Sequence, residues 1–588
     1  MTRTRHAFHE YIDGALPFDR LLHAAMGQMT RGVSPTAIQL AFMDWAAHLA
    51  INPGRQNALL EKAVRKSLRL TAFSGRCLTG DSHQRCIEPL PHDNRFEDDA
   101  WHKWPYSLIH QSFLLQQQWW HVATTGVPGV DPHHEEVVNF TVRQMLDVMS
   151  PSNYLPTNPE VIGRTIEEGG WNLVRGTSNW LEDFQEEISG HPYKQDSVED
   201  SHEFAVGENL ALTPGKVVHR NDLMELIQYS PTTETVHPEP ILIVPAWIMK
   251  YYILDLRPGR SLVEYLVSQG HTVFMVSWKN PGPADREYGM ADYRRLGIDD
   301  ALKAINHIVP DQPVHGVGYC LGGTLLTLTA AAMARENDNR LASLSLLAAQ
   351  TDFTEPGELE LFIDESQVTF LEDVMWAKGY LDHDQMAGAF QMLRSQDLVW
   401  SRMVRNYLMG EREDMFDLMA WNADATRLPY RMHSEYLRDL FMQNDLVEGR
   451  YDIDGRPVAV GDIRAPIFAI GTQKDHIAPW ESVYKIVRLA RTDVTFLLTS
   501  GGHNAGIVSE PGRPRRRYQV KHFEPLGSSY SRERFAREVE SQEGSWWPAW
   551  QQWLADHSSE PASPPSMGAP EAGYAPYTDA PGEYVLMK

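Results

Sequence analysis

From about residue 205 onward, the chain alternates short apolar runs with amphipathic helical stretches. Residues 241–245, 271–278, 314–318 and 344–348 have the length and composition of buried strands. Between the first two runs, Ser261 and Glu264 have the spacing of a capping box, and Gly270 suits the end of a helix. Repetition of strand, helix and strand predicts an α/β fold, in which a mostly parallel sheet is covered by helices on both faces.

This alternation is interrupted over residues 354–460, which contain no clear strand, and it resumes at residues 466–470 and 494–498. An insertion of that length is typical of a cap over the carboxyl ends of the strands, and we expect this cap to be helical. The region before residue 206 is predicted to be mainly helical, with Ser34 as an N-cap and a linker within residues 71–99. We therefore expect a helical extension and linker (1–90), a mainly helical domain (91–205), an α/β domain with the cap (206–556) and an extended Pro-rich tail (557–588).

Residues 318–322 read G-Y-C-L-G and lie between a strand-like and a helix-like run. This is the G-x-nucleophile-x-G pattern, whose small flanking residues allow a sharp turn that presents the central side chain at a helix N-terminus. The helix dipole favours the thiolate of Cys320, and the amide of Leu321 is a candidate donor to an oxyanion. In the alternative interpretation, Cys320 is a small apolar residue buried in a Gly-rich turn.

Two later residues complete a candidate triad. Asp475 follows the apolar run at 466–470, and His503 follows the run at 494–498. Nucleophile, acid and base occur in this order in the α/β-hydrolase fold, with the acid and the base in loops after later strands. The sequence therefore predicts an α/β-hydrolase fold in which Cys320, Asp475 and His503 are catalytic.

Charge and composition exclude several other classes. Lys and Arg number 53 against 78 Asp and Glu, which gives a net charge of −25 and disfavours binding to nucleic acid. No apolar stretch approaches the roughly 18 residues of a membrane helix, and the first residues show no secretory signal, so we expect a cytoplasmic protein. The three cysteines, Cys77, Cys86 and Cys320, predict neither a disulfide framework nor a metal site.

Several motifs together resemble those of the class I polyhydroxyalkanoate synthases. The likeness covers about residues 93–556 and includes the Cys320 motif, residues 471–480 around Asp475 and residues 501–506 around His503. It also includes residues 244–256, which hold Trp247 and Asp255, residues 421–426 with Trp421, and the upstream residues 150–159 and 228–236. Residues 246–249 depart from the family's usual Pro-x-Ile-Asn, and the backbone of Trp247 is the candidate second oxyanion donor.

The resemblance implies polymerisation of (R)-3-hydroxyacyl coenzyme A, of the short-chain kind, into polyester with release of coenzyme A. In this reading Cys320 carries the acyl group and His503 is the general base, with His476 as the nearest alternative base. Asp475 either orients His503 or activates the incoming hydroxyl. The family also implies a homodimer at the surface of a cytoplasmic polymer granule, where granule-associated proteins are possible partners, and it implies no cofactor.

Two other function classes remain open at this level. The triad alone is equally compatible with a thioesterase or a polyester depolymerase that uses a cysteine nucleophile. A granule-coat protein without catalytic activity would explain the Met and aromatic residues but not the ordered triad. The products formed from 3-hydroxybutyryl coenzyme A distinguish the three hypotheses.

Overall fold

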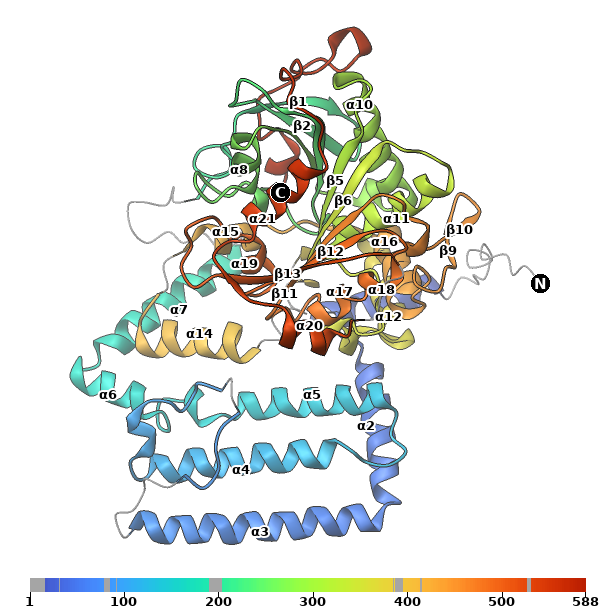
Figure 1. Cartoon of the computed structure of the whole chain (residues 1–588). Coiled ribbons are helices and arrows are strands. Elements are labelled where there is room, and N and C mark those ends of the chain that lie inside the picture. The colour runs from blue at the N-terminus through green and yellow to red at the C-terminus, as the bar shows by residue number, and fades with distance from the viewer. Residues whose placement is uncertain are drawn as a thin grey trace. The chain divides into compact units, whose positions relative to one another are not determined.

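The alternating apolar runs form the strands of one sheet (Figure 1). Within the described residues this sheet has ten strands, in the order β1-β2-β4-β3-β5-β6-β11-β12-β13-β14. The central strands from β4 to β12 pair in parallel, and the outer strands pair antiparallel. The strands are β1 (Gly215–Arg220), β2 (Met224–Tyr229), β3 (His237–Val244), β4 (His271–Trp278), β5 (Val314–Tyr319), β6 (Leu341–Leu347), β11 (Ile467–Thr472), β12 (Val494–Thr499), β13 (Arg517–Phe523) and β14 (Gln542–Glu543).

The computed structural model describes residues 16–30, 32–78, 85–90, 93–189, 204–383, 385–386, 395–412, 415–525 and 530–588. The chain divides into two compact units, and the sheet lies in the first. The first unit comprises residues 1–32, 202–385 and 415–588, and the second comprises residues 33–201 and 386–414. These limits differ from the predicted boundaries at residues 90 and 205. Helix α1 (Leu16–Thr30) joins the first unit because it packs on α12 (Glu365–Lys378), where Arg20 and His23 contact Asp373.

Helices cover both faces of the sheet, as the alternation predicts. In Figure 1, α10 (Asp300–Ile308) and α11 (Leu321–Arg335) lie on one side, and α8 (Leu262–Ser268) and α21 (Trp547–Asp556) lie on the other. Ser261 caps α8 by accepting a hydrogen bond from the N–H of Glu264. The Glu264 carboxylate accepts from Gly259 rather than from Ser261, so only half of the predicted capping box forms.

The insertion between β6 and β11 is mainly helical, as expected, but it also contains short strands. Its elements in the first unit are α12, β7 (Tyr380–Leu381), α15 (Asp417–Ala423), β8 (Leu428–Pro429), α16 (Tyr430–Glu435), η10 (Tyr436–Met442), β9 (Tyr451–Ile453) and β10 (Arg456–Val458). Strand β7 pairs with β8, and β9 with β10. These strands have two or three residues each, which is too short for a period-two pattern to be visible in the sequence. Smaller helices of this unit include α17 (Trp480–Val483), α18 (Ile486–Leu489), α19 (His503–Ile507) and α20 (Arg532–Glu538).

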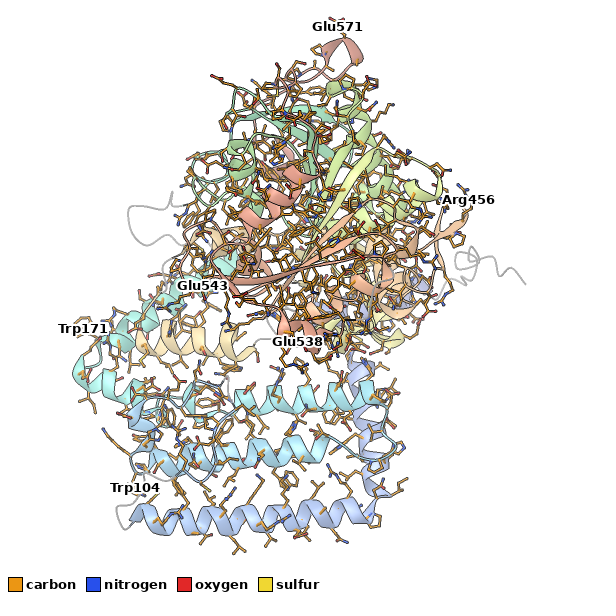
Figure 2. The ribbon with its side chains drawn as sticks, viewed as in Figure 1. Trp104, Trp171, Arg456, Glu538, Glu543 and Glu571 are labelled. Carbon is orange, nitrogen blue, oxygen red and sulfur yellow. The ribbon has the colours of Figure 1, made fainter. Side chains whose placement is uncertain are left out.

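The second unit is helical in its described residues. It contains α2 (Pro35–Ala50), α3 (Pro53–Leu78), α4 (Tyr106–Thr124), α5 (Pro132–Val148), α6 (Pro159–Glu167), α7 (Trp171–Ser189), η8 (Gln396–Trp400), α14 (Ser401–Met403) and η9 (Val404–Met409). Ser34 caps α2 as predicted. Helix α3 continues past residue 71, where a linker was expected, because Phe73 and Cys77 pack against Leu115. Trp104 and Trp171, labelled in Figure 2, are 62% and 65% exposed.

The prediction of an extended tail without packing over residues 557–588 is wrong. The side chain of Gln228 donates to the carbonyl of Ser566, and the carboxylate of buried Glu225 accepts from the N–H of Tyr584. Val585 is fully buried. The segment is held mainly by hydrogen bonds to its backbone, and few of its apolar side chains are buried. Its sequence therefore lacks the periodic pattern of apolar residues that indicates packing.

Candidate active site

The turn between β5 and α11 has the geometry of a nucleophile elbow. Cys320 has φ of +51°, a left-handed conformation that a residue with a side chain seldom adopts. A Cβ atom on Gly318 would lie 2.3 Å from Cα of Gly323, and one on Gly322 would lie 2.1 Å from the carbonyl oxygen of Val244. The glycines are therefore required by close backbone contacts. They allow β5 to turn abruptly into α11 with Cys320 at the junction.

Asp475 and His503 lie in the loops after β11 and β12, and they are in direct contact. Nδ1 of His503 is 2.8 Å from Oδ2 of Asp475. The same Oδ2 accepts from the hydroxyl of Thr472 at 2.7 Å, and Oδ1 accepts from the N–H groups of Ile477 and Ala478 at 2.9 and 2.8 Å. The side chain of Asp475 has no exposed surface. Four donors thus hold the carboxylate in one orientation, with its bond to Nδ1 leaving Nε2 of His503 for another partner.

The pKa of His503 depends on both Asp475 and Cys320. Burial by itself lowers the pKa of His503, but the negative charges of Asp475 and of the Cys320 thiolate, together with hydrogen bonds from His503 to both groups, raise this pKa well above its ordinary value. For Asp475, burial raises the pKa, but the charge of His503 and the hydrogen bonds to the carboxylate outweigh it and lower the pKa. This arrangement favours a protonated His503 beside a charged Asp475 carboxylate. The structure therefore brings the three predicted catalytic residues together.

Two tyrosines, Tyr319 and Tyr436, lie near Cys320 and His503, and neither Tyr436 nor Asn504 was predicted from the sequence as part of the site. The hydroxyl of Tyr319 donates to Oδ1 of Asn504 at 2.6 Å, and its ring lies 5.7 Å from that of His503. Burial, together with the charge of nearby Cys320, raises the pKa of Tyr436. The position of Asn504 next to His503 was a usable signal, whereas Tyr436 comes from the insertion and has no local motif. These groups leave Cys320 only 9% exposed.

One candidate oxyanion donor, Leu321, is part of the elbow, and the other, Trp247, lies in the neighbouring loop. Leu321 is the first residue of α11, so its N–H has no partner within the helix. Trp247 lies in the loop after β3, and the carbonyl groups that begin this loop face Gly322. The indole of Trp247 is buried against Tyr293 and Tyr436, with ring centroids 5.8 and 6.0 Å apart. The loop thus lies beside the elbow, as a second donor requires.

The other singled-out residues have supporting positions. The buried carboxylate of Asp255 accepts from the hydroxyls of Thr213 and Ser261, at 2.5 and 2.7 Å, so its hydrogen bonds fix the start of α8. The indole of Trp421 donates to the carbonyl of Lys250 at 2.7 Å and links the insertion to the segment after β3. His476 is half-buried and follows Asp475, but the imidazole that Asp475 contacts is that of His503.

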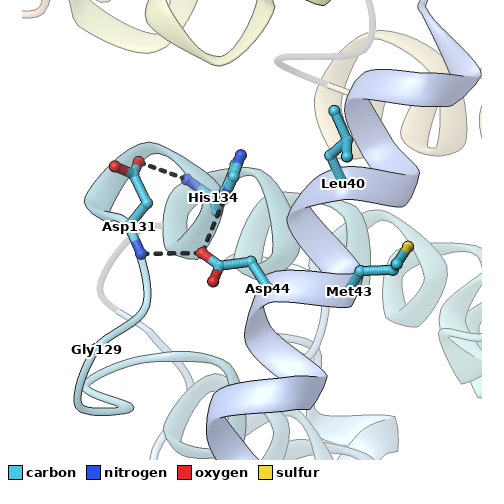
Figure 3. A pocket seen from close by; sticks show the side chains of 6 residues that line it. All are labelled: Leu40, Met43, Asp44, Gly129, Asp131 and His134. Atoms are coloured by element: carbon cyan, nitrogen blue, oxygen red, sulfur yellow. Dashed lines mark hydrogen bonds and ion pairs between the residues drawn. The ribbon is translucent and has the colours of Figure 1, made fainter.

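A pocket of about 580 Å³ in the second unit offers a different candidate site (Figure 3). Its polar residues bond to one another, since His134 Nδ1 lies 2.8 Å from Asp44 and the N–H of Asp131 donates to the same carboxylate. These bonds join α2 to α5, which makes the pocket a helix junction without a nucleophile among its lining residues: Leu40, Met43, Asp44, Gly129, Asp131 and His134. Within the described residues, no group of three or more His, Cys, Asp or Glu side chains has the arrangement of a metal site.

The mostly parallel sheet, the helices on both of its faces and the sharp turn at Cys320 define an α/β-hydrolase fold with a cysteine at the nucleophile position. Residues 239–509 match the family described as "alpha/beta hydrolase fold". Residues 92–266 match "Poly-beta-hydroxybutyrate polymerase (PhaC) N-terminus", and residues 14–55 match "Poly-beta-hydroxybutyrate polymerase N terminal". Among the helices that the structure describes, none has both the length and the apolar character needed to cross a membrane.

Curated relatives extend the match over most of the chain. The poly(3-hydroxyalkanoate) polymerase of Methylorubrum extorquens is 41% identical over 505 residues, which are 85% of this chain and 82% of the relative. The subunits from Rhizobium etli and Cupriavidus necator are 39% and 36% identical, over 85% and 84% of this chain and 78% and 83% of their own lengths. The chain therefore belongs to the poly(3-hydroxyalkanoate) polymerase family, which confirms the resemblance drawn from its motifs.

Proposed function

We propose that this chain polymerises (R)-3-hydroxyacyl coenzyme A into polyester through an acyl group carried on Cys320, with release of coenzyme A. The observation that carries the proposal is that Cys320, at a nucleophile elbow, lies close enough to raise the pKa of a His503 that Asp475 holds. Family membership supports the polymer product. By the same resemblance we propose short-chain substrates, a homodimer and a position at the surface of a cytoplasmic polymer granule.

In the first step, the thiolate of Cys320 attacks the carbonyl carbon of the substrate thioester. We propose that the N–H of Leu321 and the backbone of Trp247 stabilise the charge of the resulting oxyanion. When the tetrahedral intermediate collapses, the bond from carbon to the sulfur of coenzyme A breaks. The imidazolium of His503 gives its proton to the departing thiolate, so a neutral imidazole and an acylated Cys320 remain.

In the second step, a hydroxyl group from the growing chain or from another monomer attacks the acyl group on Cys320. Acylation has removed the thiolate charge, which is one of the causes of the raised pKa of His503. The imidazole is then neutral and accepts the hydroxyl proton while the new ester bond forms. The thiolate of Cys320 leaves, and the imidazolium and thiolate pair is restored.

Asp475 orients His503 in both steps. Its two carboxylate oxygens already accept four hydrogen bonds, and its side chain is fully buried. A carboxylate with these partners has no remaining position from which to accept a proton from a substrate hydroxyl. Of the two roles that the sequence left open, the geometry therefore favours the orienting role.

The closed surroundings favour transfer to an alcohol over hydrolysis. Cys320 and His503 are 9% and 7% exposed, so bulk water has little access to the acyl group. Exclusion of water prevents loss of a reactive intermediate by hydrolysis. The proposed steps use only the thiol, the imidazole and the backbone amides of the chain, and we propose no cofactor, since coenzyme A enters as part of the substrate.

The product formed from 3-hydroxybutyryl coenzyme A tests the proposal. We expect the wild type to release free thiol and form insoluble polyester, and Cys320→Ala to do neither while remaining folded. Cys77→Ala, which removes another buried thiol, serves as the matched control and should keep the activity. Free 3-hydroxybutyrate as the main product would indicate a hydrolase, and the absence of any reaction in the wild type would favour a coat protein.

A further inference from the structure

The ammonium group of Lys250 is buried and fully bonded. Its side chain is 2% exposed, and Nζ donates to the carbonyl of Met587 at 2.6 Å and to that of Val585. It also lies 3.3 Å from a carboxylate oxygen of Asp424. An ammonium has three N–H donors, and these three partners use them. Burial of a charge is costly unless the charge is paired, so the buried ammonium of Lys250 requires these partners.

Lys250 stands where three separate segments of the first unit meet. Its backbone carbonyl accepts from the indole of Trp421 at 2.7 Å. Nearby, the hydroxyl of Thr426 donates to the carbonyl of Trp247 at 2.8 Å, and its N–H donates to that of Ile248. The loop after β3 is therefore bonded to the insertion through its backbone and to the end of the tail through the Lys250 side chain.

We propose that Lys250 is a positioning residue that locks the Trp247 loop and the insertion in place over Cys320 by binding residues 585–588, here named the strap. The reaction assigned to this site rests on the proposed function. The strap itself is held independently, because Val585 is buried and Lys588 lies 3.2 Å from Asp424. Without the Lys250 ammonium, the strap carbonyls lose the group that joins them to the loop, and Asp424 keeps only its bonds to Tyr252 and Lys588.

The reactivity of the Cys320 thiol tests the lock without any substrate. Lys250→Met keeps much of the volume of the side chain and removes its charge. We expect a small alkylating reagent to modify Cys320 at least severalfold faster in this variant than in the wild type. Cys77 and Cys86 are buried in the second unit and provide internal references whose rates should stay unchanged. Peptide mass spectrometry reports all three rates in one sample.

Turnover of 3-hydroxybutyryl coenzyme A provides the second measurement. We expect kcat of Lys250→Met to fall by about 100-fold with a smaller change in KM, since a displacement of about 1 Å in a positioning group is enough for this loss. Deletion of the strap should reproduce both effects. Combining the deletion with Lys250→Met should add little, because the two changes break the same contact.

Lys216→Met is the matched control, because Lys216 pairs with Asp579 in the same tail but on an exposed surface. It should resemble the wild type. Wild-type Cys320 labelling and kcat in folded Lys250→Met would overturn the proposal. If that variant does not fold, Asp424→Asn and the strap deletion are measured instead, and wild-type behaviour of both overturns it. If the wild type forms no polymer, the proposed function fails, but the labelling rates still decide whether Lys250 locks the loop.

Discussion

At the scale of single residues, the site depends on how completely the carboxylate of Asp475 is used. Two backbone N–H groups bind one oxygen, and Thr472 and His503 bind the other. A carboxamide in its place would present an NH₂ group to one of these pairs. Because the backbone N–H groups cannot change, the amide oxygen must remain with them and the NH₂ must face His503.

We therefore predict that Asp475→Asn disfavours the imidazolium and holds the neutral imidazole of His503 with its proton on Nε2, the nitrogen that must accept a proton. Both acylation of Cys320 and chain elongation should slow by about 10²- to 10⁴-fold, the range that a positioned acid or base contributes. Single-turnover acylation, followed beside steady-state polymer formation, measures the two losses. A large loss of elongation with nearly normal acylation would contradict the orienting role and assign Asp475 to the incoming hydroxyl.

The sequence was sufficient to predict that Cys320, Asp475 and His503 lie together, but not what surrounds them. Cys320, Asp475 and His503 each follow a strand-like run in the required order, so local patterns located them. Tyr436 and Lys250 reach the site region through long-range packing, and no motif accompanies either of them. Their roles depend on which distant segments meet, which a local pattern does not encode.

At the scale of elements, the elbow functions through the contact between the start of α11 and the end of β3. Gly322 faces the carbonyl oxygens of Val244 and Pro245, at 2.1 and 2.5 Å from where its Cβ would lie. Backbone on both sides of this contact leaves no flexible side chain that can move aside. The position of the Trp247 loop relative to Cys320 is therefore set by the absence of a side chain at Gly322.

We predict that Gly322→Ala displaces this loop and impairs catalysis more than folding. The overpacked contact should cost about 1–3 kcal/mol of stability, while kcat should fall by about 100-fold. Thermal unfolding and thioester turnover measure the two effects. Gly163→Ala in α6, where an added Cβ meets nothing within 4 Å, is the control and should remain active. Normal turnover in Gly322→Ala would show that the contact does not position the loop.

Local sequence patterns predicted some of these elements correctly and others wrongly. The parallel strands and α8 were predictable, because burial on both faces and a capping residue leave strong local signals. Residues 557–588 were predicted to be an unpacked tail, because proline-rich composition usually accompanies extended chains. Their packing relies on buried Glu225 and Lys250, whose charged side chains read as surface residues in a sequence.

At the scale of the whole molecule, buried neutral histidines connect the fold to pH. Burial lowers the pKa of His271 to about 3 and that of His315 to about 4. His271 stacks on His237 with ring centroids 4.6 Å apart. An unfolded chain binds protons at these histidines near pH 6.5, whereas the folded chain does so only at lower pH. Their contribution to stability is thus fully present above pH 6.5 and is lost as the pH falls toward 4 and 3.

We predict that the protein loses about 1.5 kcal/mol of stability per such histidine between pH 6.5 and pH 5. Thermal unfolding across this range measures the slope. His271→Phe preserves a ring that can stack on His237 and should flatten the slope by one histidine's share. An unchanged slope in that variant would show that His271 does not bind its proton on unfolding.

The two units are interleaved along the chain, since the second needs residues 386–414 and the first is resumed on both sides of them. During synthesis at about 5–20 residues per second, the interval between residue 201 and residue 414 lasts about 10–40 s. Throughout that time residues 33–201 of the second unit have been synthesised but residues 386–414 of the same unit have not. Residues 585–588 are synthesised long after Cys320. The nascent chain therefore contains Cys320 for some time before Lys250 can bind the strap.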